Sequence, residues 1–296
     1  MSILENGVEL SMFNKLSEPV LEDKGDGFAK HTINFEKSTK IISVNGGYIA
    51  AAMLRTVKAI CDDTPANMSI QFIKRVAAGE AKIETEMVRI SSSQVALFQV
   101  SLFQKGFLAA ISQIWTFQEC VAPSVHTGSM PVVPHPDEMQ SIESIIAKRM
   151  PKAPFWEAFE QRHINFLDMG KRKNPTPRSL RWMRHKDGVG EDRFSKASAV
   201  LPIVDVLGVP AALNVLGPTS NIVKASTLNL NIQYFDISSI DGWLLGDAYA
   251  ECINGRLLSF RVQVWSISGS LVCQGIGQMF TGGQAVDQTI NDQVEQ

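Results

Sequence analysis

The stretch NGGYIAAAMLRTV, residues 45–57, decides how this chain folds. Two glycines stand directly before a run of small apolar residues that continues on nearly every helical face as far as Ile60. A helix that is apolar all round is a buried helix. The glycines permit a close approach to the helix start, where unpaired N–H groups carry a partial positive charge. We therefore expect a buried helix whose N-terminus is packed tightly or binds a ligand.

Four strand-like runs follow this helix. In each run, apolar and polar residues alternate with the period of two that is typical of a strand with one buried face. The runs are residues 69–75, 81–89, 96–104 and 109–117. Lys105 and Gly106 separate the last two runs and favour a turn. This order predicts an antiparallel sheet that covers the helix.

The C-terminal part of the chain repeats the same order of strand-like runs. The corresponding runs are residues 230–236, 243–251 and 259–265. Matched positions are separated by 162, 162 and 163 residues in the pairs Phe72 and Tyr234, Phe98 and Phe260, and Gly106 and Gly269. The nearly constant offset predicts two copies of one helix-plus-sheet unit.

The second copy needs a buried helix of its own, and the apolar residues 195–207 fit that role. Asp192 precedes this segment, and we expect the helix to end near Gly208. Pro202 would kink the helix or lie in its first turn.

A proline-rich segment separates the two copies. Residues 118–154 contain six prolines, a density that is typical of a linker. The predicted division is an N-terminal unit, residues 1–118, a linker, residues 119–154, and a C-terminal unit, residues 155–296. We expect residues 155–167 to open the second unit as a helix or strand and residues 179–185 to form a strand.

Composition narrows the classes of function. The chain has 296 residues, of which 45% are hydrophobic, and a formal net charge of −2, which favours neither nucleic acid nor an anionic membrane as partner. Neither a secretory signal at the N-terminus nor an apolar run of about 18 residues is recognisable, so we expect no membrane-spanning helix. The four cysteines are scattered without CxxC spacing, which favours a reduced, cytoplasmic setting.

Several other chemistries lack their sequence motifs. The five histidines show neither HxxxH nor HExxH spacing, so no metal site is predicted. The GxSxG elbow of α/β-hydrolases is absent, as are the glycine-rich loops that bind nucleotides. The sequence therefore predicts no metal and no cofactor.

One long apolar helix wrapped by a curved antiparallel sheet, twice in one chain, resembles the double-hotdog acyl-CoA thioesterase-like superfamily. Residues 45–57 resemble the Gly-Gly-Tyr start of the first central helix of that family. Residues 226–235, STLNLNIQYF, resemble the strand that opens the second sheet, and residues 243–275 resemble the strands that end it. The resemblance implies an α+β fold of two tandem hotdog units, each a curved antiparallel sheet around a buried central helix.

The resemblance also implies a binding site at the start of the first helix. Asn45 and the backbone near Gly46 and Gly47 would hold the oxyanion that forms from a thioester carbonyl, with Tyr48 beside the substrate. The alternative is tight helix–sheet packing with no ligand.

Hydrolysis also needs a group that activates water. The resembled family uses a carboxylate on the strand that opens the second sheet, together with a hydroxyl and a glutamine. These positions fall here on Asn229, on or near Glu251, and on Gly277, with Gln278 one residue later. An amide can orient water but cannot take its proton. A one-residue shift reverses a strand side chain, so Gln278 would need a bulge to enter the site.

Asp205 is the more unusual carboxylate, because it lies inside an apolar helix. An ionised carboxylate there is costly unless it is paired. We expect it to bond a backbone group or an arginine such as Arg181 or Arg184, in a structural role. A raised pKa would instead make it a catalytic candidate. Glu251 is the other candidate carboxylate, with an ordinary exposed strand glutamate as its alternative.

Three functions are consistent with these observations. The first is hydrolysis of an acyl thioester of CoA or of a carrier protein, with Asn229 and Gln278 orienting the water. The second is a non-hydrolytic hotdog tailoring enzyme of secondary metabolism, of the dehydratase or cyclase type, with Asp205 or Glu251 as acid or base. The third is a non-catalytic acyl-binding protein. The expected partners are an acyl thioester or another small apolar substrate and further copies of the chain, which would associate through exposed sheet edges.

Overall fold

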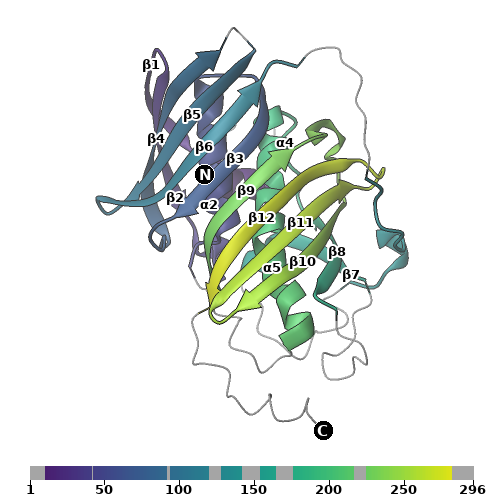
Figure 1. The fold of residues 1–296 in the computed structure, drawn as a ribbon. Helices are drawn as coiled ribbons and strands as arrows, with labels where there is room; N and C mark the ends of the chain where they lie inside the picture. Colours follow the sequence, from purple (N-terminus) through teal and green to yellow (C-terminus); the bar gives the residue numbers. More distant parts are fainter. Residues whose placement is uncertain are drawn as a thin grey trace.

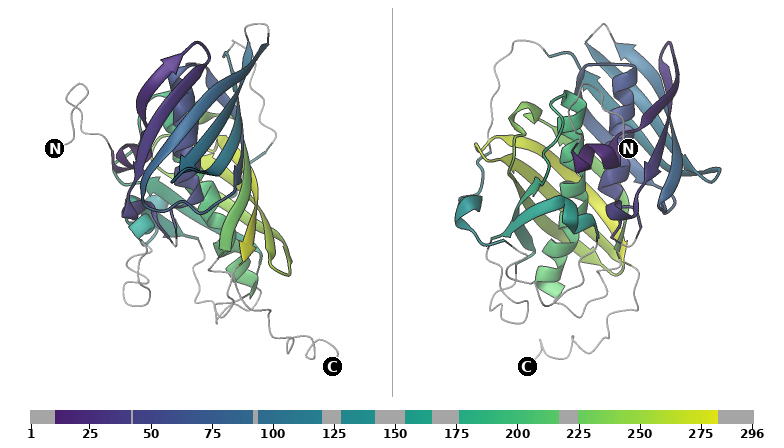
Figure 2. Two further views of the ribbon diagram at one scale, coloured as in Figure 1. Left: turned by 90° about the vertical axis from the view of Figure 1, so that its left-hand side faces the viewer. Right: turned by 180° about the vertical axis from the view of Figure 1, so that it is seen from behind.

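The computed structural model describes residues 11–41, 43–91, 94–119, 128–141, 154–164, 176–216 and 225–281. Its strands form one continuous sheet of 12 strands, in which every pairing is antiparallel. The sheet curves around a pair of long helices, which lie together on its inner side (Figures 1 and 2).

The first half of the sheet has the strand order β1-β2-β4-β5-β6-β3. Its elements are α1 (Met12–Ser17), β1 (Val20–Gly25), β2 (Phe28–Phe35), α2 (Gly46–Thr56), β3 (Thr64–Phe72), β4 (Gly79–Ser91), β5 (Val95–Gln104) and β6 (Phe107–Phe117). Short 3-10 turns, η1 (Lys37–Thr39) and η2 (Val57–Ala59), flank α2.

The second half has the order β9-β12-β11-β10-β8-β7. Its elements are η3 (Pro136–Glu138), η4 (Pro154–Ala158), β7 (Phe159–His163), β8 (Arg178–His185), α4 (Arg193–Ala199), α5 (Leu201–Leu216), β9 (Ala225–Tyr234), η7 (Ile237–Ser239), β10 (Leu244–Asn254), β11 (Leu257–Ser266) and β12 (Leu271–Thr281). The opening segment of this half is therefore a 3-10 turn followed by a strand.

The two halves join where β3 pairs with β9 at the centre of the sheet. Each of these strands carries a bulge, at Ala66 in β3 and at Leu228 in β9, and the two bulges are separated by the 162-residue offset of the repeat. Read outward from the centre, the two halves have equivalent strand orders, β3-β6-β5-β4-β2-β1 and β9-β12-β11-β10-β8-β7. The prediction of two tandem hotdog units is thus confirmed.

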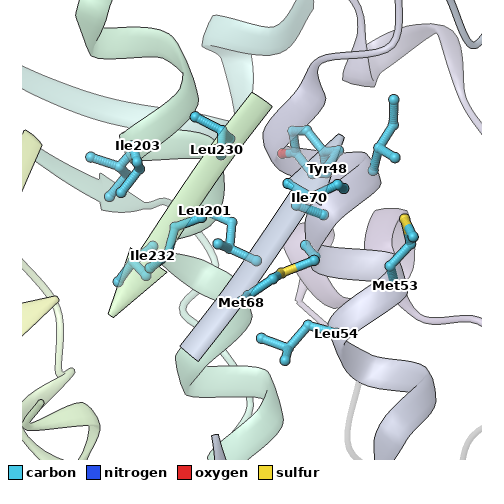
Figure 3. Packing of buried hydrophobic residues seen from close by; sticks show 14 of the residues in the cluster. Tyr48, Met53, Leu54, Met68, Ile70, Leu201, Ile203, Leu230 and Ile232 are labelled. Carbon is cyan, nitrogen blue, oxygen red and sulfur yellow. The ribbon is translucent and has the colours of Figure 1, made fainter. Parts of the chain in front are cut away.

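The core lies between the sheet and the two central helices. Met68 and Ile70 from β3, with Leu230 and Ile232 from β9, point toward these helices and are buried (Figure 3). Tyr48 of α2 belongs to this core too, because it is fully buried and its ring packs against Phe155.

Helix α2 begins at the predicted place, with Asn45 as its N-cap. The Asn45 side chain accepts a hydrogen bond from the Gly47 N–H at 3.0 Å. A Cβ atom on Gly47 would come within 2.3 Å of the Pro202 Cα, so only glycine lets the two central helices approach so closely here. This confirms the expectation of tight packing at the helix start.

The second central helix differs from its prediction at its C-terminal end. It breaks at Val200, and Pro202 then lies in the first turn of α5, where a missing N–H costs little. The expected end near Gly208 was wrong, because α5 continues to Leu216. A Cβ on Gly208 would come within 2.6 Å of the Phe260 ring, so this glycine serves close packing against β11 instead of ending the helix.

Together α4 and α5 form a helical segment of 24 residues, Arg193–Leu216, that contains a window of 18 predominantly apolar residues. Among the described residues it is the one helix long and apolar enough to cross a membrane, but it lies mostly buried in the core. Its apolar character is therefore explained by the interior of the protein.

Two further segments depart from the sequence expectations. The hairpin of β1 and β2 was not predicted, because β1 is exposed along its whole length and shows no alternation. In the predicted linker, residues 128–141 lie on the outer face of the second half of the sheet, where Met130, Val133 and Met139 pack on a cluster of tryptophans. Trp182 of β8 donates a hydrogen bond to the Pro134 carbonyl at 3.0 Å.

Candidate active site

A buried carboxylate meets the N-terminus of α2. Asp205 comes from α5, is 3% exposed, and accepts a hydrogen bond from Asn45 Nδ2 at 2.6 Å. The same oxygen, Oδ2, accepts from the Gly47 N–H at 3.2 Å. The other oxygen, Oδ1, accepts from the Thr227 hydroxyl at 2.7 Å. The expected bond to a backbone group is confirmed.

The expected arginine partners of Asp205 lie elsewhere. Arg181 donates to Gln161, and Arg184 donates to Glu160. The carboxylate is instead held by neutral donors and by the positive end of a helix. Among the described residues, none of the hydrogen bonds to Asp205 comes from a cationic side chain.

Gly46 makes room for this carboxylate. A Cβ atom on Gly46 would lie 3.0 Å from Asp205 Oδ1 and 3.0 Å from the Phe72 ring. The two glycines thus have different purposes, since Gly47 permits helix packing and Gly46 leaves space beside a charged oxygen. Gly46 and Thr227 are both partly exposed, so the site borders solvent on their side.

A β-bulge brings Thr227 into the site. In β9, Leu230 and Ile232 face the helices, whereas Asn229 and Asn231 face outward. Strict alternation would also turn Thr227 outward. The extra residue Leu228 shifts the register between the pairs Gln278–Asn229 and Met279–Thr227, and Thr227 therefore faces Asp205. Sequence reasoning missed Thr227, because the signal for a bulge is weak without the pairing partner.

The surroundings tune the proton affinity of Asp205. Burial raises its pKa above the ordinary value, although hydrogen bonds from Thr227, from the backbone of Gly47 and Gly46, and from Asn45 act in the opposite direction. A carboxylate with a raised pKa accepts a proton from water more readily than an ordinary one. The arrangement can therefore orient a water molecule and take its proton.

The other predicted residues are not brought to Asp205. Asn229 and Gln278 lie opposite each other in the sheet, on its outer face, and Gln278 Nε2 donates to the Ser259 hydroxyl at 3.2 Å. Glu251 is exposed and pairs with Arg261 at 2.8 Å, as expected for an ordinary strand glutamate. At Gly277, a Cβ atom would come within 2.7 Å of both Leu230 and Phe260, so core side chains fill the expected glutamine position.

The repeat creates an equivalent place at the N-terminus of α4. Its N-cap is Asp192. Asp205 lies 13 residues after this cap, and Lys58 likewise lies 13 residues after Asn45, the cap of α2. Lys58 and Asp205 are therefore equivalent positions in the two units. Lys58 Nζ lies 3.3 Å from Asp192 Oδ2. The 162-residue offset places Pro65 where Thr227 stands in the other half. Only the α2 end therefore combines a buried carboxylate with a hydroxyl.

The described residues were also compared with the requirements of a metal site. Across the ranges that the structure describes, no group of three His, Cys, Asp or Glu side chains could hold a metal ion.

Comparisons with known proteins agree with this architecture. Residues 36–118 match the acyl-CoA thioesterase N-terminal domain, and residues 127–280 match the acyl-CoA thioesterase C-terminal domain. No curated protein matches the chain.

Solved structures resemble the whole chain at low sequence identity. A putative thioesterase II from Thermobifida fusca is 20% identical, with a TM-score of 0.76 over 93% of this chain and 99% of that one. A hotdog-fold protein of unknown function from Alicyclobacillus acidocaldarius is 17% identical, with a TM-score of 0.76 over 92% and 98%. An acyl-CoA thioesterase II from Mycobacterium marinum is 15% identical, with a TM-score of 0.69 over 91% and 98%. The two matched domains cover most of the sequence, and the chain belongs to the acyl-CoA thioesterase family with a double-hotdog fold.

Proposed function

We propose that this protein hydrolyses acyl thioesters at the site formed by Asp205, Thr227 and the N-terminus of α2. The observation that carries the proposal is the buried Asp205 carboxylate, which is held by Asn45, Gly47 and Thr227 and forms no ion pair with any residue that the structure describes. Burying such a group costs stability, so a chemical role is the reason for keeping it.

In the proposed reaction, Asp205 and Thr227 position a water molecule beside the thioester carbonyl. The water oxygen attacks the carbonyl carbon while its proton moves to the Asp205 carboxylate. The tetrahedral intermediate then collapses, the carbon–sulfur bond breaks, and the thiolate leaves and takes the proton from Asp205. The products are a carboxylic acid and a free thiol.

The N-terminus of α2 acts mainly on the carboxylate in this scheme. The Gly47 N–H donates to Asp205 and also to the cap oxygen of Asn45. Asn45, Gly46 and Gly47 therefore hold the base in place, whereas the sequence analysis assigned them to the oxyanion. Tyr48 contributes through the core and does not touch substrate, since its side chain is fully buried.

CoA thioesters are the substrates we propose. The support is membership of the acyl-CoA thioesterase family and the name of the similar protein from Mycobacterium marinum. Water orientation by Asn229 and Gln278 would require both side chains to reach the inner face, and we leave these residues out of the mechanism.

Thiol release from a panel of acyl-CoA substrates, short to long and aliphatic to aromatic, tests the proposal. We expect turnover by the natural sequence, a loss of about 100-fold or more in Asp205→Asn, and no loss in Asp241→Asn, the same change at an exposed aspartate. A loss confined to Asn229→Ala would instead favour the site on the outer face. If no substrate releases thiol, hydrolysis is excluded, and a non-hydrolytic reaction with Asp205 as base becomes the next function to test.

A further inference from the structure

Strand β8 carries three arginines, of which Arg181 is the most buried, with 7% of its surface exposed. The more exposed Arg178 pairs with Asp247 at 2.8 Å, and Arg184 pairs with Glu160 at 3.0 Å. Among the residues that the structure describes, no aspartate or glutamate forms an ion pair with Arg181. Solvation alone would favour the reverse, because a buried cation needs a counter-charge more than an exposed one.

The pleat of β8 explains why Arg181 is buried. Trp182 faces the outer side of the sheet, where it belongs to the tryptophan cluster. Its neighbours Arg181 and Met183 therefore face the central helices. Arg181 lies opposite Gly246 of β10, and the side chain of Leu207 from α5 packs on that glycine. The arginine is thus attached to the core side of the sheet.

Within the described part of the protein, the guanidinium of Arg181 makes one hydrogen bond. Its Nη1 donates to Oε1 of Gln161, a buried residue of β7, at 2.9 Å. The Trp156 ring lies with its centroid 5.5 Å from Cζ. Nε is buried and has no hydrogen-bond partner among the described residues. These contacts leave the edge formed by Nε and Nη2 without an acceptor.

An edge of this kind has the geometry of a carboxylate site. The N–H bonds of Nε and Nη2 are parallel and match the two oxygens of one carboxylate. Arg178 makes this contact three residues away, because its Nε and Nη2 donate to the two oxygens of Asp247 at 2.8 and 2.9 Å. Arg181 offers the same pair of donors to a ligand.

We propose that Arg181 binds the carboxylate of an apolar acid through Nε and Nη2. Gln161 and Trp156 hold the guanidinium in place, one through Nη1 and the other against a face of the planar group. The ligand supplies the counter-charge that the described part of the chain does not provide.

The charge state of Arg181 suits an anion. Burial lowers the pKa of Arg181 to about 9. This value is still above neutral pH, so the guanidinium is protonated when the ligand arrives. A bound carboxylate favours the charged form and raises the pKa of Arg181 again. Binding therefore removes the cost of keeping an unpaired cation inside the protein.

The neighbours of Arg181 select the rest of the ligand. Met183 and Leu207 are fully buried, and Trp156 is partly exposed at η4. Apolar side chains of this kind favour a hydrocarbon tail. They give nothing in return for the hydration that an anion such as inorganic phosphate would lose. The ligand class is thus a monocarboxylic acid with an apolar tail.

The Arg181 site is separate from the Asp205 site. Thr227 holds Asp205 at β9, whereas Arg181 is on β8, and β12, β11 and β10 lie between these strands (Figure 1). Four strand spacings of about 4.8 Å each give about 19 Å along the sheet. Binding of an acid at Arg181 therefore does not depend on the hydrolysis proposed above.

Isothermal titration calorimetry of the full chain with hexanoate tests the proposal. We expect hexanoate to bind, and the neutral analogue hexan-1-ol to bind at least about 10-fold more weakly, because only the acid pairs with the guanidinium. Arg181→Met removes the donors and should abolish this difference. The matched control Arg184→Met makes the same change at an arginine of β8 that already has a carboxylate, and it should bind hexanoate like the natural sequence.

Asp205→Asn separates this proposal from the proposed hydrolysis, because it should lose turnover but keep the hexanoate binding that depends on Arg181. Without ligand, Arg181→Met should hold or raise the melting temperature, since it removes an unpaired buried charge. If Arg181→Met does not fold, Arg181→Lys keeps the charge without the paired donors and should weaken hexanoate binding at least about 10-fold.

Three results would overturn the proposal. The first is equal binding of hexanoate by the natural sequence and by Arg181→Met. The second is the absence of binding at about 10 mM hexanoate. The third is Arg181-dependent binding of inorganic phosphate in place of hexanoate, which would contradict the ligand class.

Discussion

The N-termini of α2 and α4 are equivalent places in the two hotdog units, but they hold opposite groups. At α2 the cap is the amide Asn45, and the group that meets it is the buried carboxylate of Asp205. At α4 the cap is the carboxylate Asp192, and the group that meets it is the ammonium of Lys58, which is half exposed. The fold is the same, so the side chains alone decide which end can carry chemistry.

The two carboxylates also differ in their proton affinity. Burial raises the pKa of Asp205 overall. Burial acts on Asp192 too, but hydrogen bonds from Ser195 and the charge of Lys58 outweigh it and leave the pKa of Asp192 below its ordinary value. The α4 end is thus an ordinary stabilised cap, whereas the α2 end keeps a carboxylate at a cost in stability. The reaction that we propose at α2 would account for this difference.

The largest expected effect separates the two ends by activity. Asp205→Asn keeps the shape of the side chain but removes the proton acceptor, so kcat should fall by about 100-fold or more. Lys58→Met, the change at the equivalent residue, should leave kcat and KM unchanged. Steady-state thiol release measures both variants, and an equal loss in the two would end the distinction between active and inactive ends.

Removing the Thr227 hydroxyl should have the next largest effect. A hydrogen bond to a charged group contributes about 1.5–3 kcal/mol, so Thr227→Val should lower kcat about 10-fold to 100-fold. Thr227→Ser keeps the hydroxyl and should restore most of the rate. Failure of the serine variant to recover activity, with the fold intact by circular dichroism, would assign Thr227 to packing only.

A methyl group at Gly46 sharpens the same comparison. Its Cβ would lie 3.0 Å from Asp205 Oδ1, so Gly46→Ala should displace the carboxylate and reduce kcat about 10-fold. Stability should hold or fall slightly, because the methyl group also crowds the Phe72 ring at 3.0 Å. The preference for alanine over glycine, about 1 kcal/mol, applies to helix interiors and not to the first residue of α2. Arg193→Ala at the first position of α4 is the counterpart and should leave kcat unchanged. Full activity in Gly46→Ala would show that the Asp205 position is not critical.

The smallest effects concern stability and its dependence on pH. Folding raises the pKa of Asp205, so the protonated side chain contributes to the stability of the folded state. This contribution to stability is lost as pH rises through the folded-state pKa. Asp205→Asn should therefore raise the melting temperature above that pH. The lowered pKa of Asp192 gives the opposite sign, so its contribution is present at neutral pH and is lost as pH falls.

Asp192→Asn keeps a good cap and removes a partly exposed ion pair, so it should lower stability at neutral pH by less than about 1 kcal/mol. Differential scanning calorimetry of both variants from about pH 2 to pH 8 measures the two trends, because the contribution of Asp192 is lost only below its ordinary pKa of 3.8. Parallel trends in the two variants would contradict the opposite pKa directions.

Much of the fold could be predicted because its signals are local. The buried helix at residues 45–57 and the alternating strands follow from the spacing of apolar residues, and the 162-residue offset reveals the repeat. Asp205 was also noticed from local sequence, since a carboxylate inside an apolar helix is costly and unusual. The hairpin of β1 and β2 gave no such signal, because β1 buries no side chain.

Which strand residues face the site could not be predicted in the same way. Alternation assigns faces only until a bulge interrupts it, and the bulge at Leu228 turns Thr227 inward while Asn229 remains outward. The length of α5 escaped prediction for a similar reason. Gly208 and Pro210 look like a helix end, but packing of α5 against β8, β10 and β11 carries the helix to Leu216.

By itself, the sequence determined the first central helix, the place of the second, most strands of the two halves of the sheet and their repetition, because helical and strand periodicity require only neighbouring residues. Tertiary structure decided that Asp205 of one unit meets the helix start of the other, 160 residues earlier, and that a bulge adds Thr227. It also decided that the expected amides lie on the opposite face. Such contacts depend on register and on helix–helix approach, which are set by packing across the whole sheet and leave no mark in any short stretch of the chain.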